Sequence, residues 1–122
     1  MAPGKPRYDL EAAKKAPDIQ ISTSCARKAN EVLLCASDSE ARKYIRGLFQ
    51  TLTPADFAHV QPMRGASGPT IYGDVYGKKD EFGLWFFKFS FDGTTTTVIM
   101  SCHEAEHDIT LADDRTLRKP RP

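Results

Sequence analysis

Aromatic side chains at every second position from residue 85 to residue 91, within an aromatic segment over 82–91, constrain this chain most strongly. Side chains alternate between the two faces of a β-strand, so a spacing of two predicts a strand. The next segment, Thr95–Cys102, is rich in β-branched residues and predicts a partner strand, joined through Asp92-Gly93. Alternation assigns one face to the core: Trp85, Phe87, Phe89, Phe91, Val98, Met100 and Cys102. The opposite face is expected to be open: Leu84, Phe86, Lys88, Ser90, Thr97, Ile99, Ser101 and His103.

Helical signals dominate the first half of the chain. A helix is expected over 8–16, ended by Pro17, and another from about Thr23 to Cys35. Ser37-Asp38-Ser39-Glu40 fits a capping box before an amphipathic stretch that reaches residue 52, and Pro54 to Ala58 reads as a single turn. Short strands are expected at 19–21 and 70–76.

Helices followed by strands predict an α+β domain, with N-terminal helices packed on one face of a C-terminal antiparallel sheet. We expect a loose segment over residues 1–7, one domain over 8–105, and a C-terminal tail over 106–122.

Composition narrows the possible partners. The formal net charge of +1 on 122 residues excludes a strongly basic nucleic-acid binder, although a local basic site remains possible. No apolar run approaches the ~20 residues that cross a bilayer, so no membrane partner is expected. Three cysteines without close spacing predict reduced thiols in a cytoplasmic protein.

Histidines supply the candidate chemistry. His59 and His103 together suit a general base and a general acid, because imidazole titrates near neutrality. Lys88 interrupts an aromatic strand and suits a phosphate contact, unless it is an ordinary solubilising charge. His103-Glu104-Ala105-Glu106-His107 matches the HExxH pattern of zinc peptidases, whose histidines bind the metal from one helix. Here the preceding residues read as a strand.

Several motifs taken together resemble the MqsR toxins, the mRNA-cleaving halves of a bacterial toxin–antitoxin pair. The likeness extends over residues 8–105 and rests on the order and spacing of four segments. These are Leu52-Thr53-Pro54-Ala55-Asp56-Phe57, Thr70-Ile71-Tyr72-Gly73-Asp74-Val75-Tyr76, Trp85-Phe86-Phe87-Lys88 and Ser101-Cys102-His103-Glu104. The resemblance implies the small α+β ribonuclease-toxin fold related to RelE.

The resemblance also implies a site, with departures from the family pattern. Two family lysines fall on His59 and His103, the family glutamine falls on Gly73, and the family tyrosine falls on Phe86, while Lys88 is kept. We therefore expect His59, His103 and Lys88 to be catalytic in a metal-independent cleavage of mRNA by its 2′-hydroxyl, without cofactor. The residues expected to bind substrate are Arg64, Phe86, Lys78 and Lys79. A cognate antitoxin, itself DNA-binding, is the implied protein partner.

Such a site also predicts the register of the last two strands. A two-residue turn at Asp92-Gly93 would place His103 opposite Phe82, far from Lys88. A four-residue loop, Gly93 to Thr96, would place His103 opposite Phe86 and diagonal to Lys88. We predict the longer loop.

Two other functions stay open at this stage. One is a non-catalytic module that binds RNA or protein on the same fold, because Gly73 and Phe86 lack the family's functional groups. The other is a small zinc peptidase built on His103, Glu104 and His107.

Overall fold

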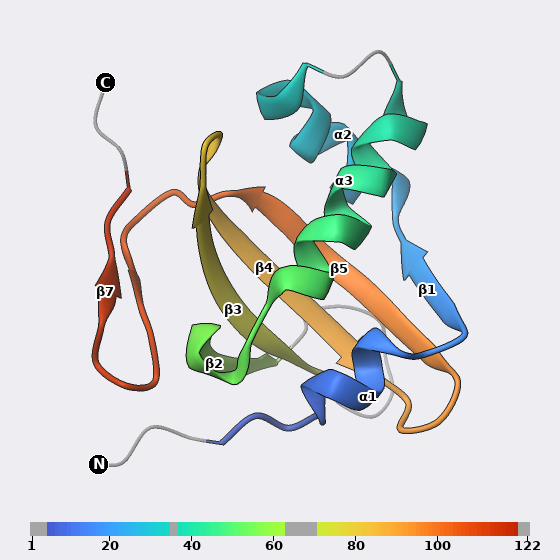
Figure 1. The fold of residues 1–122 in the computed structure, drawn as a ribbon, viewed down its shortest axis with the longest axis vertical. Coiled ribbons are helices and arrows are strands. Elements are labelled where there is room, and N and C mark those ends of the chain that lie inside the picture. The colour runs from blue at the N-terminus through green and yellow to red at the C-terminus, as the bar shows by residue number, and fades with distance from the viewer. Residues whose placement is uncertain (1–4, 35–36, 63–70, 120–122) are drawn as a thin grey trace.

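A five-stranded mixed sheet forms the centre of the molecule (Figure 1). The computed structural model describes residues 5–34, 37–62 and 71–119. The strands are β1 (Asp18–Ile21), β2 (Phe57–Pro62), β3 (Tyr72–Asp80), β4 (Gly83–Phe91) and β5 (Thr96–Glu104), in the order β1-β5-β4-β3-β2. Neighbours are antiparallel except β1, which pairs with β5 in parallel. The expectation of an α+β fold is confirmed, whereas the wholly antiparallel sheet is wrong because the early strand joins its edge.

In the part of the chain that the structure describes, α1 (Leu10–Lys14) precedes β1, and α2 (Thr23–Leu33) and α3 (Asp38–Thr51) lie between β1 and β2. Ser22 and Ser37 cap α2 and α3, each accepting a hydrogen bond from the backbone N–H three residues on. A 3₁₀ turn, η1 (Pro54–Asp56), follows α3, with proline in its first turn as the sequence predicts.

The larger core lies between the helices and one face of the sheet (Figure 1). Phe49 of α3 stacks on Phe87 of β4, with ring centroids 5.5 Å apart, and meets Phe89 edge-on. The predicted aromatic face of β4 is buried here: Trp85, Phe87, Phe89 and Phe91. Because the helices cover this face, only the opposite face of the sheet can carry an open site.

The core face of β5 differs from the simple alternation expected. Its inward residues are Thr97, Ile99 and Cys102, whereas Val98 and Met100 are only partly buried. A β-bulge opposite Lys88 and Phe89 inserts one extra residue into β5, so the alternation changes phase along the strand. The expected placement of Val98 and Met100 in the core, and of Thr97 and Ile99 on the open face, is therefore wrong.

A second, smaller core covers part of the opposite face. It contains Ala58, Val75, Leu84, Ala105, Ile109 and Leu111. The last of these come from a hairpin of β6 (Ile109–Thr110) and β7 (Thr116–Leu117), which appears beside β3 in Figure 1. Gly77 of β3 lets this hairpin approach, because a Cβ there would lie 3.0 Å from Ile109 and 3.1 Å from Leu117. The segment over 106–122, expected as a tail, thus includes a hairpin whose Ile109, Leu111 and Leu117 pack on the domain.

Asp74 ties the start of the chain to the sheet. Its buried carboxylate accepts hydrogen bonds from the backbone N–H groups of Arg7 and Tyr8, both at 2.9 Å. The Arg7 guanidinium also lies 4.5 Å from the centre of the Tyr72 ring. The acidic residue of the predicted 70–76 strand is therefore structural, and Arg7, expected in the loose segment, is held.

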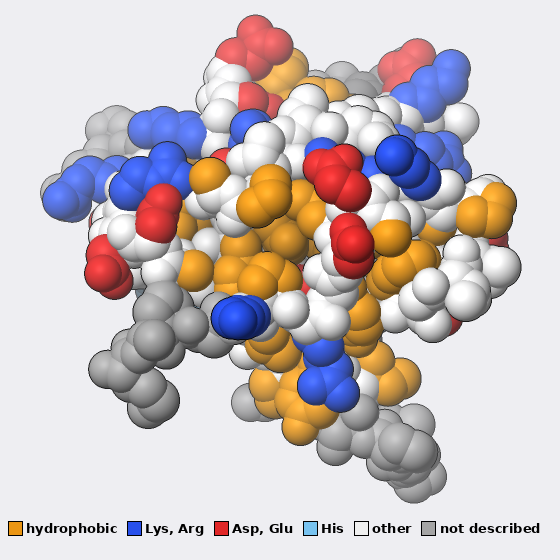
Figure 2. All heavy atoms as spheres, turned by 60° about the horizontal axis from the view of Figure 1, so that its bottom comes forward, with side chains coloured by type: hydrophobic (Ala, Val, Ile, Leu, Met, Phe, Trp, Pro, Cys, Tyr) orange, Lys and Arg blue, Asp and Glu red, His pale blue; other side chains and the backbone are white. Residues whose placement is uncertain are grey.

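Charge is dispersed over the outside of the molecule. Figure 2 shows hydrophobic side chains in the middle of one face, with basic and acidic side chains interspersed around them. Among the residues that the structure describes, basic side chains form no broad stripe on that face, in agreement with the net charge of +1. Among the helices that the structure describes, none is both long and apolar enough to cross a membrane.

Candidate active site

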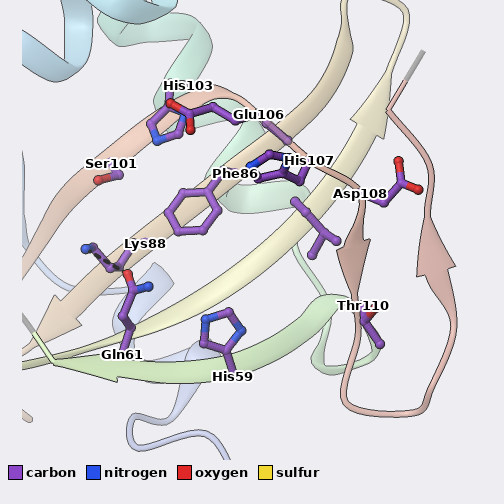
Figure 3. Close-up of a pocket in the computed structure, with 12 residues that line it drawn as sticks. His59, Gln61, Phe86, Lys88, Ser101, His103, Glu106, His107, Asp108 and Thr110 are labelled. Atoms are coloured by element: carbon purple, nitrogen blue, oxygen red, sulfur yellow. Dashed lines mark hydrogen bonds between the residues drawn. The ribbon is translucent and has the colours of Figure 1, made fainter. Parts of the chain in front are cut away.

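A hollow of about 540 Å³ opens on the sheet face opposite the helices (Figure 3). Strands β2, β4 and β5 supply its floor: His59, Gln61, Phe86, Lys88, Ser101 and His103. The segment that follows β5 supplies its wall: Ala105, Glu106, His107, Asp108, Ile109 and Thr110. All three histidines of the chain therefore surround one cavity, together with a lysine.

Two β-bulges direct the histidines into this hollow. In β2 the bulge falls between Phe57 and His59, so Phe57 faces the larger core while His59 faces the hollow. In β5 the bulge lies before Ser101, so His103 faces the hollow although Thr97 and Ile99 face the core. Regular alternation would bury residues at both histidine positions. Bulges that re-aim a side chain are frequent beside active sites.

The register agrees with the prediction at the site. His103 lies opposite Phe86, and Lys88 lies opposite Ser101. The connection differs in detail, because Asp92–Thr95 join the strands and the bulge shifts the pairing by one residue. Asp92 holds this loop by accepting hydrogen bonds from the N–H groups of Thr94, Thr95 and Thr96.

Lys88 occupies the middle of the floor, on the central strand β4. Its Nζ donates a hydrogen bond to Oε1 of Gln61 at 3.2 Å, shown as the dashed line in Figure 3. Burial lowers the pKa of the Lys88 ammonium below its ordinary value. The Lys88 ammonium supplies the positive charge of this half-buried floor.

His59 lies on the edge strand β2, opposite Val75, which is in turn opposite Lys88. Burial, and secondarily the positive charge of Lys88, lower the pKa of the His59 imidazole below its ordinary value. The ring is therefore neutral over a wider pH range than an ordinary histidine. A neutral imidazole beside a cation can accept a proton.

His103 is held by a ring contact and a backbone contact. Its imidazole stacks on Phe86, with centroids 5.0 Å apart and planes 16° from parallel. Nδ1 lies 2.9 Å from the carbonyl oxygen of Glu104. A carbonyl oxygen can only accept, so Nδ1 carries the hydrogen and Nε2 is the nitrogen left to exchange a proton.

The wall of the hollow adds two acidic residues and a third histidine to the lining. Glu106, His107 and Asp108 come from the loop between β5 and β6. Figure 3 shows Glu106 beside His103 and His107 beside Phe86, whereas Asp108 lies on the hairpin side, where its carboxylate accepts a hydrogen bond from the Lys119 N–H at 2.7 Å. The HExxH pattern thus runs from a strand into a loop, not along a helix. Among the residues that the structure describes, no three His, Cys, Asp or Glu side chains form a metal-binding group. The zinc-peptidase interpretation is therefore wrong in its structural premise.

Not all predicted site residues meet in the hollow. His59, Phe86, Lys88 and His103 do. Lys78 lies at the helix side of the sheet, where its Nζ is 3.5 Å from the carboxylate of Asp56, and Lys79 is exposed outside the cavity lining. Neither is placed to bind a substrate there. Arg64 lies outside the described residues.

Sequence reasoning missed Gln61 and most of the wall. Gln61 follows His59 by two positions on the same strand, so the period of two that identifies strand faces could have revealed it. Glu106 lies within the HExxH pattern and Asp108 directly after it, but nothing in a charged C-terminal segment indicates that it folds back on the sheet.

Comparisons with protein-family models, with curated proteins and with solved structures find no match for this chain.

Proposed function

We propose that the protein is an endoribonuclease that cleaves single-stranded RNA, without a metal ion, by attack of a ribose 2′-hydroxyl on the adjacent phosphate. The observation that carries the proposal is the convergence of His59, Lys88 and His103 around one open hollow, with the Phe86 ring beside them. A base, a cation and an acid are the three groups that this reaction needs.

Each residue has a role in the proposed reaction. His59 is the base, since burial and the charge of Lys88 lower its pKa and keep its imidazole neutral. It takes the proton of the 2′-hydroxyl as the 2′-oxygen bonds to phosphorus. The Lys88 ammonium stabilises the additional negative charge on the phosphorane. His103 gives a proton from Nε2 to the 5′-oxygen as the P–O bond breaks. The products carry a 2′,3′-cyclic phosphate and a 5′-hydroxyl.

His59 and His103 reach the hollow from β2 and β5, the outer two of four neighbouring strands, and Lys88 lies on β4 between these strands. A single phosphate held over Lys88 would therefore have the base on one side and the acid on the other. A base could stack on Phe86, as unpaired bases stack on aromatic rings in single-stranded RNA binders.

The biological setting proposed is that of an MqsR-like, RelE-related toxin that acts on cytoplasmic mRNA and is neutralised by a DNA-binding antitoxin. The support is the set of sequence motifs together with the α+β order of the elements. A non-catalytic RNA-binding module on the same fold is the alternative, because Phe86 brings no hydroxyl to the site.

Purified protein incubated with single-stranded RNA in excess EDTA tests the proposal. We expect cleavage products that end in a 2′,3′-cyclic phosphate and a 5′-hydroxyl, and no cleavage where the ribose is replaced by deoxyribose. Loss of cleavage in EDTA would contradict the mechanism. RNA binding without any cleavage would favour the binding module. Lys43→Ala, which removes an exposed cation from α3 on the other side of the sheet, is the control and should cleave normally.

A further inference from the structure

The stem of Lys88 runs over a glycine. A Cβ at Gly73, on the neighbouring strand β3, would lie 2.6 Å from Cγ and 2.9 Å from Cδ of Lys88, and 3.3 Å from Sδ of Met100. Real Cβ atoms do not approach other heavy atoms so closely. The absence of a side chain at Gly73 is therefore what allows the lysine to extend sideways from β4 across β3.

The far end of the same side chain is held from the next strand. Gln61 of β2 lies directly opposite Gly73 in the antiparallel register. Its Oε1 accepts the hydrogen bond from Lys88 Nζ at 3.2 Å. Lys88 thus spans from β4 over β3 to β2, where His59 lies two residues before Gln61 on the same strand.

This arrangement selects one of several possible positions for the ammonium group. A lysine side chain has four rotatable bonds and loses considerable rotamer entropy when it is held in one place. Without the gap at Gly73 and the acceptor at Gln61, the ammonium would be free to sample other positions over the floor of the hollow. The space at Gly73 lets the Lys88 stem reach toward β2, and the hydrogen bond to Gln61 holds the ammonium there.

We propose that Gly73 and Gln61 are positioning residues, which hold the Lys88 ammonium beside His59 at the β2 side of the hollow. The inference rests on the proposed function only for its catalytic consequence, since the placement of Lys88 can be tested separately. Gly73 provides the space for the lysine stem, and Gln61 provides the acceptor for its head. Neither residue contacts the reacting atoms in this account.

An NMR titration of His59 tests the placement without any substrate. Lys88 lowers the pKa of His59, so Lys88→Met should raise that pKa. Gly73→Ala should raise it too, because a methyl group displaces the lysine stem. In the Gly73→Ala/Lys88→Met double variant the alanine should add no further shift. The other charged groups around the hollow, His103, Glu106, His107 and Asp108, are the same in all four proteins.

Two results would overturn the proposal. One is a His59 titration that Gly73→Ala leaves unchanged in a folded protein. The other is a Gly73→Ala shift that persists when Lys88 is already methionine. If Gly73→Ala does not fold, Gln61→Leu removes the acceptor at a partly exposed position and should move the His59 pKa in the same direction; an unchanged titration there would overturn the proposal equally.

RNA cleavage supplies the catalytic readout. A displaced cation should lower kcat by about 10- to 100-fold in Gly73→Ala and Gln61→Leu, with KM changed less than about twofold, because the substrate still binds to the hollow. Gly47→Ala is the control, since a Cβ at that exposed position of α3 meets nothing within 4 Å. Unchanged kcat in both site variants would contradict the positioning role. If the wild-type protein cleaves no RNA, the proposed function fails, and the titration alone decides the placement of Lys88.

Discussion

His59 and Lys88 form an electrostatic pair at the residue scale. Burial lowers the pKa of both groups, and the cation lowers the pKa of the imidazole further. The cost of holding a cation in a partly dry site is offset by its hydrogen bond to Gln61. The pair gives one neutral proton acceptor and one positive charge close together, which is the combination that attack on a phosphodiester needs.

The pH dependence of cleavage should report this pair. A base acts only when unprotonated, so kcat/KM should fall as pH drops through the pKa of His59 in the free enzyme. That pKa is lowered, so the acid limb should lie below about 6.5, the ordinary value for histidine. In Lys88→Met the remaining activity should show this limb at higher pH. A wild-type acid limb above 6.5, or one that does not move in Lys88→Met, would contradict the assignment of His59 as base.

The sequence pointed to residues whose chemistry is unusual for their place. A lysine within an aromatic strand and a histidine at the end of its partner stood out, and both line the hollow. Gln61 was not predicted, because a glutamine in a short polar strand has many ordinary explanations. Its role depends on a contact over 27 residues of sequence, which no local pattern contains.

The β-bulges are the decisive feature at the element scale. Each inserts one residue into a strand and reverses which side chains face the helices. Periodicity within β4 was a sound guide because that strand is regular where it is buried. The same argument failed for the first half of β5, since no residue type marks the bulge. The predicted pairing of Phe86 with His103 survived because the bulge lies beyond it.

The β6–β7 hairpin is the second element that the sequence did not indicate. Its strands have two residues each, too short for a periodic signal. Its position depends on Gly77, whose missing side chain leaves space for Ile109 and Leu117. The wall of the hollow is part of the connection between β5 and this hairpin, so the shape of the site depends on how the hairpin packs.

Gly77→Val should therefore loosen the wall. The larger side chain would occupy the positions of Ile109 and Leu117, and such overpacking typically costs about 1–3 kcal/mol. We expect a lower free energy of unfolding in urea and faster amide exchange within residues 109–117. Gly47→Ala, in an exposed helical position, should instead be neutral or stabilise by up to about 1 kcal/mol. Wild-type stability and exchange in Gly77→Val would show that the hairpin does not depend on this contact.

At the scale of the whole molecule, the two faces of one sheet have different roles. The helices and the larger core occupy one face. The other face is only partly covered by the smaller core, and the uncovered part is the hollow. The α+β order and the existence of an open face followed from the sequence. The parallel edge strand β1 did not, because its partner is more than 70 residues away and pairing direction has no local signature.

The dispersed charge of the molecule also bears on its RNA contact. A formal net charge of +1 provides little overall attraction for a polyanion. The proposed contact is local, centred on Lys88, so its salt dependence should be shallow compared with that of a basic nucleic-acid binder. Two of the groups in the proposed site are histidines, which a formal charge count scores as neutral.

The central claim is that His59 and His103 together cleave RNA in this hollow. Its most direct test compares initial cleavage rates of one single-stranded RNA, in EDTA, by the wild-type protein and by His59→Ala/His103→Ala, with circular dichroism confirming that both are folded. The account predicts a loss of at least about 100-fold in kcat/KM, the usual contribution of acid–base groups. Wild-type cleavage by the folded double variant would contradict it.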